Sequence, residues 1–337
     1  MRRSLKTLIL VVLLFSSNFP ATTSAQAGKP DTHKKGSLAA SKMLLWHEPE
    51  DIRTRDLYYG AGGKEDLPQG KLKFLSEDHN GSSPKFEVED EQGTKWKIKL
   101  GPEAQSETAA TRLVWAAGYF TDEDYYFPEL RVEGMKPLKR GQHFISADGL
   151  VRGARLERHL KGEKKVGTWK WDDNPFAKTK ELDGLKVLMA LINNWDLKTE
   201  NNGIYQGKDG SCRYLISDLG ASFGKTGNSF TRTRNDLKGY LESKFIKKAK
   251  PQKVDFVLHS RPFFLLFFDL PYYHQRTHME KLVKDIPRSH AKWMGDLLAQ
   301  LSEQQISDAF RAAGYTPQEV SAFTRKVRER IAELNEL

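Results

Sequence analysis

Cysteine is almost absent from the 337-residue chain, in which Cys212 is the only thiol. One cysteine cannot close an internal disulfide, and it cannot form a two-cysteine zinc site or a redox-active pair. Long apolar runs are also missing, because the run at residues 8–15 has eight residues and a membrane-spanning helix needs about 20. The core must therefore form without covalent cross-links, and we expect no transmembrane span once the N-terminal segment is removed.

The N-terminus has the layout of a secretory signal. Basic residues at positions 2, 3 and 6 precede the apolar run, and small residues follow it. This order of a charged, an apolar and a small-residue region is typical of a cleaved signal peptide. We therefore predict a signal peptide at residues 1–27, a flexible polar leader at residues 28–43, and an exported protein that is periplasmic or secreted.

The charge balance is moderately basic. The formal net charge is +10, and removal of the three basic residues in the signal leaves +7. Such a surface favours anionic partners. Basic residues are matched by nearby acidic ones over most of the chain, and no nucleic-acid-binding motif is present, so we expect no nucleic-acid partner.

The first half of the chain is predicted to be rich in β-structure. Alternating polar and apolar residues, separated by Asn-Gly and other turn signals, indicate strands. The expected strands lie at residues 71–76, 85–89, 95–100, 130–132 and 151–160. A helix is predicted at residues 103–117, where apolar residues recur at helical spacing and Gly118 ends the pattern. The glycine-rich segment 58–63 is expected to be a flexible connection.

The second half is predicted to be mainly helical. Apolar residues from Leu185 to Ile192 lie on one face of a helix that ends at Asn193. Further helices are expected at residues 288–301, 303–313 and 317–336. The sequence thus predicts a β-rich lobe at residues 44–165 and a helical lobe at residues 166–337.

Two short segments resemble the catalytic motifs of protein kinases. Residues 194–201, Asn-Trp-Asp-Leu-Lys-Thr-Glu-Asn, resemble the catalytic loop H-R-D-L-x-x-x-N. Residues 214–220 resemble the strand and the D-F-G motif that follow it, and they end in Asp218-Leu219-Gly220. The layout is similar to that of atypical kinases, namely the HipA type, the phosphatidylinositol kinases and the secretory-pathway kinases. This resemblance implies an α+β, protein-kinase-like two-lobed fold with the catalytic loop in the helical lobe.

The resemblance also implies a role for each motif residue. Asp196 would orient and deprotonate the attacking hydroxyl, while Asn201 and Asp218 would hold Mg²⁺ against the phosphates of ATP. Lys198 would place a positive charge beside the transferring phosphoryl group. The implied function is ATP- and Mg²⁺-dependent phosphoryl transfer to a hydroxyl of a protein or a small molecule.

A kinase-like β-rich lobe should also supply a lysine for the α- and β-phosphates and a helix glutamate that holds this lysine. Lys97 and Lys99 lie on the same face of the strand at residues 95–100, so their spacing does not choose between them. We favour Lys99, because both of its neighbours on the strand are apolar and would be buried. Glu107, on the helix that follows, is the expected partner.

Two glycine-containing segments bear on nucleotide binding. The turn at residues 79–83 lies where a phosphate-covering loop is expected, but it lacks G-x-G-x-x-G. We therefore assign phosphate contacts to Ser82, Ser83 and backbone N–H groups. Residues 220–226 resemble a Walker A loop, but Leu219 stands where that motif needs a glycine, so a P-loop site is not favoured.

Other interpretations stay open. Asn194 and Trp195 replace the usual His and Arg before the catalytic aspartate, and no A-P-E motif follows. An exported pseudokinase that binds a nucleotide or a partner without catalysis is therefore the main alternative. A purely structural surface protein is another, in which the two motif aspartates would only cap a turn or end a strand, and Lys99, Glu107 and Asp218 would not converge.

Overall fold

The computed structural model describes residues 42–81, 83–159, 162–227, 231–258 and 277–337. Residues 41–337 form one compact unit. The predicted signal peptide, most of the predicted leader, and Ser82 lie outside the described residues. Among the described helices, none combines the length and the apolar character that are needed to cross a membrane.

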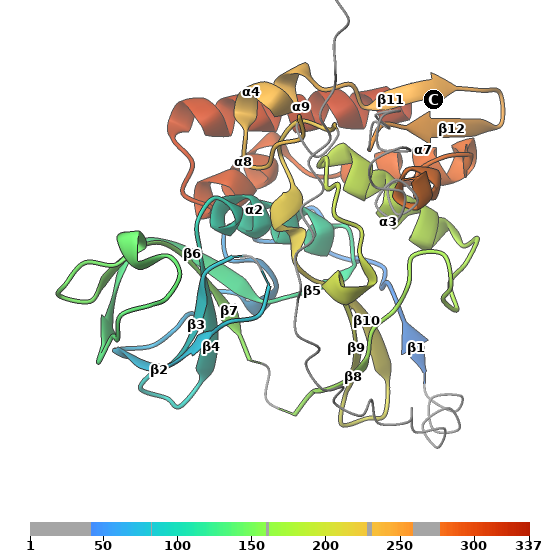
Figure 1. The fold of residues 1–337 in the computed structure, drawn as a ribbon. Helices are drawn as coiled ribbons and strands as arrows, with labels where there is room; N and C mark the ends of the chain where they lie inside the picture. Colours follow the sequence, from blue (N-terminus) through green and yellow to red (C-terminus); the bar gives the residue numbers. More distant parts are fainter. Residues whose placement is uncertain (1–41, 82, 160–161, 228–230, 259–276) are drawn as a thin grey trace, which may run out of the picture. The chain divides into compact units, whose positions relative to one another are not determined.

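Five strands of the first half form a closed barrel (Figure 1). The strands are β2 (Leu72–Asp78), β3 (Lys85–Glu89), β4 (Lys95–Leu100), β6 (Asp124–Glu133) and β7 (Leu150–Arg158). Their order is β2-β3-β4-β7-β6, and each neighbouring pair is antiparallel except β2 and β6. The predicted bounds of β3 and β4 are confirmed, whereas β6 begins earlier than predicted.

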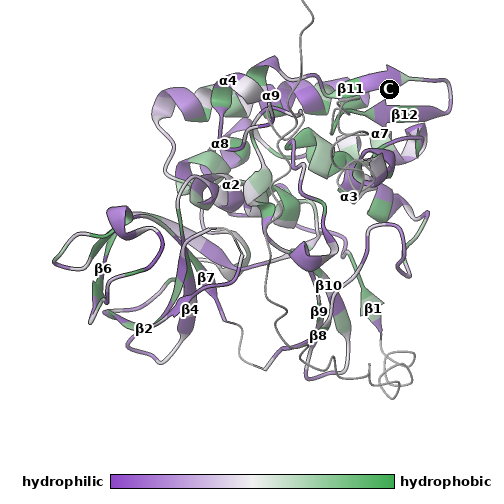
Figure 2. Ribbon diagram, in the orientation of Figure 1, coloured by the Kyte–Doolittle hydropathy of each residue, from purple (hydrophilic) through white to green (hydrophobic). Residues whose placement is uncertain are grey.

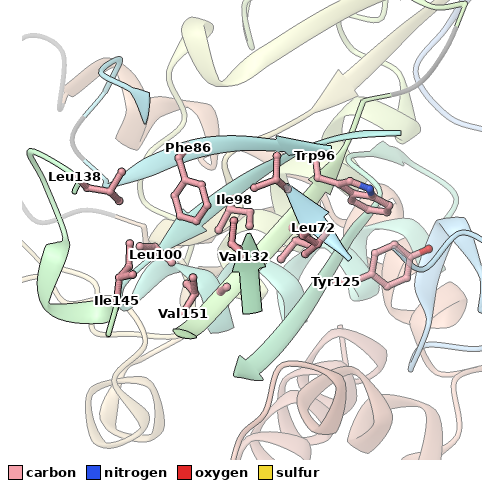
Figure 3. Close-up of a cluster of buried hydrophobic side chains, with 13 residues drawn as sticks. Leu72, Phe86, Trp96, Ile98, Leu100, Tyr125, Val132, Leu138, Ile145 and Val151 are labelled. Carbon is pink, nitrogen blue, oxygen red and sulfur yellow. The ribbon is translucent and has the colours of Figure 1, made fainter. Parts of the chain in front are cut away.

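Successive side chains of β4 point alternately into the barrel and away from it. Trp96, Ile98 and Leu100 are buried among the apolar residues inside the barrel (Figure 3). Lys97 and Lys99 therefore point outward, because successive side chains of a strand alternate between its faces. Full burial of a large apolar side chain contributes about 1.5–3 kcal/mol, so this core fixes the face on which Lys99 lies.

Helix α2 (Glu103–Ala116) follows β4 after a short turn and packs against β4, β6 and β7 of the barrel. It also packs against α8 (Glu303–Ala312) and the short 3-10 helix η5 (Leu219–Ala221). Nearly all of its residues are buried. Glu103 and Glu107, one turn apart, are thus held on one face of a helix that packs against β4.

A five-stranded sheet contains the strands next to the two kinase-like motifs. β9 (Asn202–Gln206) and β10 (Cys212–Ile216) form a hairpin whose turn lies at residues 207–210. β8 (Lys164–Gly167) pairs with β9, while β1 (Met43–Leu44) and β5 (Phe120–Thr121) pair with β10. Residues 194–201 therefore lead directly into β9, and Asp218 follows β10 after one intervening residue.

Helices dominate the rest of the second half. α3 (Lys180–Leu191) precedes the catalytic-loop segment and is largely hydrophobic (Figure 2). The later helices are α4 (Leu237–Glu242), α7 (Arg288–Leu298), α8 and α9 (Pro317–Asn335). α7 packs against α3 and α9, and α9 packs against α8 and α4. The predicted helices near the C-terminus are confirmed, with slightly shorter ends.

The prediction of a mainly helical second half missed a small sheet. Its three strands are β11 (Ile246–Ala249), β12 (Lys253–Phe256) and β13 (Ile286–Pro287). Val254 and Phe256 are buried, whereas Lys253 is exposed and Asp255 is only partly buried. This alternation with period two is a strand signal that the basic composition of the segment conceals.

The glycine-rich segment 58–63 is not a loose connection, which corrects the prediction. Gly60 to Gly62 form the 3-10 helix η2, and Gly60 is buried with a φ of 74°. A Cβ atom at Gly60 would clash with the guanidinium of Arg112. Glycine is therefore needed both for the left-handed backbone and for close packing on α2.

The predicted α+β fold class is confirmed, and the elements follow the two-lobed order of a protein kinase. A β-barrel with a helix packed against it comes first, and a mainly helical half follows. The predicted lobe bounds of 44–165 and 166–337 stay a prediction. Strand β8 extends across that boundary.

Candidate active site

Lys99 of β4 lies at the centre of the site. Its Nζ atom is 2.7 Å from Oε2 of Glu107 and 2.6 Å from Oδ1 of Asp218. A third carboxylate, that of Glu103, lies 3.0 Å away. The Lys99 side chain is 3% exposed, so these contacts replace almost all of its hydration. A buried charge is tolerated when it is paired and hydrogen-bonded, and the carboxylates provide this pairing.

The fold explains why Lys99 rather than Lys97 makes these contacts. Both side chains point outward from β4, but Lys97 pairs with Glu157 at 3.3 Å and is 29% exposed. Lys99 instead meets Glu103 and Glu107, which lie one turn apart on the same face of α2. The structure therefore decides a choice that the spacing of the two lysines left open.

Charge pairing sets the protonation of Lys99 and Asp218. Burial alone would lower the pKa of Lys99, but the carboxylates of Glu107 and Asp218 outweigh this effect and raise that pKa. Burial would likewise raise the pKa of Asp218, and the Lys99 ammonium holds that pKa below its ordinary value. Lys99 is therefore a cation and Asp218 an anion at neutral pH.

Arg155 of β7 holds the other oxygen of Glu107. Its Nη2 atom is 3.3 Å from Oε1 of Glu107, and the same guanidinium pairs with Asp124 and Glu157. Lys99 and Arg155 are cross-strand neighbours in the β4–β7 pair. Sequence reasoning missed Arg155, because only the closure of the barrel places β7 beside β4.

Asp196 is oriented by two side chains of its own loop. Nζ of Lys198 lies 2.9 Å from Oδ1 of Asp196. Nδ2 of Asn201 donates to the main-chain oxygen of Asp196 at 2.9 Å and to its Oδ2 at 3.3 Å. These bonds hold the carboxylate in one orientation, and 19% of the side chain stays exposed.

A main-chain hydrogen bond joins the two motifs, because the N–H of Ser217 donates to the oxygen of Asn201 at 2.9 Å. Asp218 then adopts a left-handed backbone, with φ 52° and ψ 52°. This conformation costs a non-glycine residue roughly 1–3 kcal/mol and clusters at functional sites. The Asp218 side chain makes no helix-cap hydrogen bond and pairs with Lys99 instead.

Most of the predicted site residues line one cavity of about 480 Å³. Its wall includes Ser83, Lys99, Asp196, Lys198, Asn201 and Asp218. Glu107 lies behind Lys99 and is 1% exposed, while Ser82 is outside the described residues. The convergence of Lys99, Glu107 and Asp218 contradicts the purely structural interpretation, which expected them to lie apart.

Ser83 reaches the charged cluster through Glu103. Its Oγ donates to Oε2 of Glu103 at 2.7 Å, and the same oxygen lies 3.0 Å from Nζ of Lys99. In this arrangement the Ser83 hydroxyl positions a carboxylate. The turn between β2 and β3 is thereby tied to α2.

Charged side chains that sequence reasoning did not assign also line the cavity, namely Lys85, Glu103, Glu200, Arg232 and Arg234. Lys85 lies opposite Lys99 in the β3–β4 pair, and the register of the predicted hairpin is a signal that could have found it. Arg232 and Arg234 belong to an irregular segment after Asp218. No periodicity or motif marks them in the sequence.

Asp218 and Asn201 have the chemistry to hold Mg²⁺. Nδ2 of Asn201 is bonded to Asp196, which leaves Oδ1 of Asn201 as the atom for a cation. Carboxylate and amide oxygens suit Mg²⁺, which usually takes one or two protein carboxylates together with substrate phosphates. The described part of the chain has no group of three or more His, Cys, Asp or Glu side chains able to hold a metal.

Comparisons with known proteins find similarity only among solved structures. No protein-family model matches the chain, and no curated protein matches it. The chain is similar to the Helicobacter pylori proinflammatory kinase CtkA, with 10% identity and a TM-score of 0.46 over 80% of this chain and 98% of that one. The Golgi casein kinase gives 13% identity and a TM-score of 0.38 over 81% and 73%. The amicoumacin kinase hAmiN gives 11% and 0.24 over 79% and 90%.

These identities are too low to transfer a substrate or a residue role to this chain. Functional statements about this chain therefore depend on the geometry of its own cavity.

Proposed function

We propose that this chain is an ATP- and Mg²⁺-dependent phosphotransferase that acts on a hydroxyl group of a protein or a small molecule. The observation that carries the proposal is the pairing of Lys99 with Glu107 and Asp218 beside the cavity that contains Asp196. Protein kinases use a lysine held by a helix glutamate, next to a metal-binding aspartate, to bind the phosphates of ATP.

Lys99 supports the phosphate-binding part of this proposal. Its ammonium is charged, and Glu107, which is held from behind by Arg155, keeps it in place. Lys85 adds a second positive charge across the β3–β4 pair. Phosphoryl transfer requires little covalent chemistry from the protein, so positioning and charge stabilisation supply most of the rate.

Asp196 supports the role of general base. A base must lie within hydrogen-bond reach of the proton that it removes, about 2.6–3.2 Å. Asn201 and Lys198 orient the Asp196 carboxylate at the cavity wall, where an acceptor hydroxyl can approach it. In the proposed reaction Asp196 orients this hydroxyl and accepts its proton.

Asp218 and Asn201 support the metal-binding part. Mg²⁺ held by their oxygens would neutralise charge on the phosphates. The main-chain bond from Ser217 to Asn201 keeps the two ligand residues at a fixed separation. This separation is set by the chain before any substrate binds.

The proposal is tested by Mg²⁺-dependent ATP binding and turnover by the mature chain. We expect Asp196→Ala to reduce turnover by about 100-fold or more, since a general base contributes about 10²–10⁴-fold. Asp218→Ala should also reduce turnover, because it removes the proposed metal ligand. Asp209→Ala is the matched control, because Asp209 is exposed in the β9–β10 turn, outside the cavity. Turnover that is equal in the wild type and in both cavity variants would refute the proposal.

Thermal denaturation with and without ATP distinguishes the proposed enzyme from the remaining alternative, a pseudokinase. A pseudokinase would be stabilised by ATP without turning it over, because ligand binding to the folded state raises its stability. Turnover that depends on Asp196 excludes this alternative. Absence of both stabilisation and turnover excludes nucleotide binding altogether.

We also propose that the chain is exported after cleavage of residues 1–27. The charged, apolar and small-residue regions at the N-terminus support this location. Cell fractionation and N-terminal sequencing of the mature protein test it. An intact Met1 in a cytosolic fraction would contradict it.

A further inference from the structure

A segment after the D-L-G motif is fixed to the start of the catalytic loop. We call its described residues, 222–227 and 231–236, the anchored segment. The N–H of Phe223 donates to the oxygen of Ile192 at 2.8 Å. Nδ2 of Asn193 donates to the oxygen of Gly224 at 2.7 Å. These two bonds join the first part of the segment to the residues between α3 and the catalytic loop.

The two parts of the anchored segment are bonded to each other. The N–H of Thr233 donates to the oxygen of Lys225 at 3.1 Å, and the N–H of Lys225 donates to Oγ1 of Thr233 at 2.8 Å. The N–H of Asp236 donates to the oxygen of Phe223 at 2.8 Å. A Cβ atom at Gly224 would clash with the main-chain oxygen of Thr233, so glycine is needed for this close approach.

Trp195 joins the second part of the anchored segment to the catalytic loop. Its indole N–H donates to the main-chain oxygen of Thr233 at 3.0 Å, and its side chain is 6% exposed. The guanidinium of Arg232 lies 3.8 Å from the centre of the same ring. Because Trp195 directly precedes Asp196, the bond to Thr233 ties the proposed base to the segment.

The second part of the anchored segment also reaches α2. Arg234 pairs with Glu103, whose carboxylate lies 3.0 Å from Nζ of Lys99. Nδ2 of Asn235 donates to Oε1 of Gln105 at 3.2 Å. The segment therefore connects the catalytic loop with the helix that holds the phosphate-binding lysine.

We propose that Trp195 is a positioning residue, whose bond to Thr233 keeps the anchored segment and the catalytic loop in their working arrangement without phosphorylation of that segment. The inference rests on the proposed function, because the working arrangement is the one that places Asp196 and Lys99 around one cavity. Segments that phosphorylation orders gain contacts from the added charge. The anchored segment makes its contacts with groups that the chain already has.

The Thr233 hydroxyl supports independence from phosphorylation. Its Oγ1 accepts from the N–H of Lys225 and donates to Oδ2 of Asp236 at 2.7 Å. A phosphate on this oxygen would remove its proton and place negative charge against the Asp236 carboxylate. Like charges at such a distance repel, so phosphorylation of Thr233 would loosen the segment rather than order it.

Native-state hydrogen exchange, followed by NMR on the mature chain, tests the anchor. The amides of Thr233 and Asp236 are the reporters, since both donate across the anchored segment. Trp195→Phe keeps a ring beneath Arg232 and loses only the N–H donor. We expect the reporter amides to exchange about 2- to 10-fold faster in this variant, as for the loss of one hydrogen bond.

Amides of β10 separate positioning from a general loss of stability. A purely structural effect of Trp195→Phe would speed exchange in β10 and in the anchored segment by the same factor, whereas a local opening speeds only the segment. Trp46→Phe is the matched control, because the indole N–H of Trp46 also donates to a main-chain oxygen, that of Ala117, at 2.7 Å outside the cavity. It should leave the reporter amides unchanged.

Turnover gives a second measurement, namely ADP release from MgATP. Trp195→Phe should lower kcat by about 2- to 10-fold, because the bond that positions Asp196 is lost. KM for ATP should stay the same, since Lys99 keeps its contacts with Glu107 and Asp218. Trp46→Phe should match the wild type. Phosphatase treatment of the wild type should change neither kcat nor exchange.

Two outcomes overturn the inference. Equal exchange of the reporter amides in the wild type and in Trp195→Phe would show that the indole bond anchors nothing. Loss of reporter protection after phosphatase treatment would show that phosphorylation orders the segment. A wild type that releases no ADP refutes the proposed function instead, and the exchange experiment still tests the anchor.

Discussion

At the scale of single residues, Lys99 is the cation that the neighbouring carboxylates share. Lys99→Met would leave Glu107, which is 1% exposed, with Arg155 as its remaining partner at 3.3 Å. Removal of one partner from a buried ion pair costs about 3–5 kcal/mol, and we expect a loss of this size in the free energy of unfolding. Urea denaturation measures it, and ATP binding should be lost in parallel.

Lys95→Met is the control for this change, because Lys95 is exposed on the same strand. A substitution at an exposed site of this kind usually changes stability by less than about 0.5 kcal/mol. Equal effects of the two substitutions would show that the buried ion pairs at Lys99 contribute no stability of their own.

The stability that Lys99 and Asp218 share should depend on pH in a defined direction. The pKa of Asp218 is held below 3.8, so its contribution is present above pH 3.8 and is lost as pH falls through the lowered value. The pKa of Lys99 is raised above 10.5, so its contribution is present below pH 10.5 and is lost as pH rises through the raised value. The penalty of Lys99→Met, measured by urea denaturation across pH, should be largest between these limits. A penalty that grows in acid would contradict this assignment.

The residues predicted from sequence are those that belong to a motif or to a regular element. Asp196, Asn201 and Asp218 come from spacing within short segments, and Lys99 and Glu107 come from the order of a strand and a helix. The other site residues are brought in by the packing of segments that are distant in the sequence, and no local pattern encodes this packing. Arg155 reaches Glu107 through strand pairing, and Arg232 reaches Trp195 through an irregular segment.

At the scale of elements, α9 holds the end of α3 just before the catalytic-loop segment. Arg330 of α9 is fully buried and donates to the oxygen of Leu191 at 2.6 Å, to Oδ1 of Asn193 at 2.8 Å and to the oxygen of Ser243 at 3.0 Å. Nδ2 of Asn193 in turn donates to the oxygen of Gly224 at 2.7 Å. The C-terminal helix thus positions the segments on both sides of the catalytic loop.

Arg330→Met should destabilise the fold by about 3 kcal/mol or more, because each buried oxygen left without a partner costs about 1–3 kcal/mol. Turnover should also fall, since the end of α3 loses its anchor. Arg325→Met tests the same helix at a site that is 66% exposed and should be close to neutral. Urea denaturation of both variants measures the difference, and equal stabilities would show that α9 does not anchor this region.

The prediction of helices and strands succeeded where the periodic pattern of apolar residues was long. It failed where the strands were short and rich in lysine. Helices α7, α8 and α9 have clear periodicity, and α8 and α9 begin with capping boxes at Ser302 and Thr316. Strands β11 to β13 have two to four residues each, and lysines dominate β11. Short strands of this kind are stabilised by their neighbours rather than by their own sequence.

At the scale of the whole molecule, Cys212 reports on global unfolding. It is fully buried on β10, between strands β1 and β9. We expect its thiol to react with a thiol reagent only after the sheet opens, so labelling in native buffer should be slower than in urea by orders of magnitude. Rapid native labelling would show that this sheet opens independently of the rest.

The mature chain should melt at the same temperature with and without a reductant, since it has no second cysteine to pair.

The division into a β-rich and a helical half could be predicted because composition and periodicity change along the chain. The contacts between the two halves could not be predicted in this way. β1 at the start of the described chain pairs with β10, and α2 of the first half packs against α8 of the second. Such pairings between distant segments depend on the packing of complete elements, which single windows of sequence do not contain.

The direct pairing of Lys99 with Asp218 at 2.6 Å has a thermodynamic consequence. Before a nucleotide binds, Lys99 competes with any cation for the carboxylate of Asp218. Phosphates that bind Lys99 would release this carboxylate, so each ligand should strengthen the binding of the other by the same factor. Titration of Mg²⁺ with and without a nucleotide should therefore show positive cooperativity, and the resting site should resist loading by the metal ion alone.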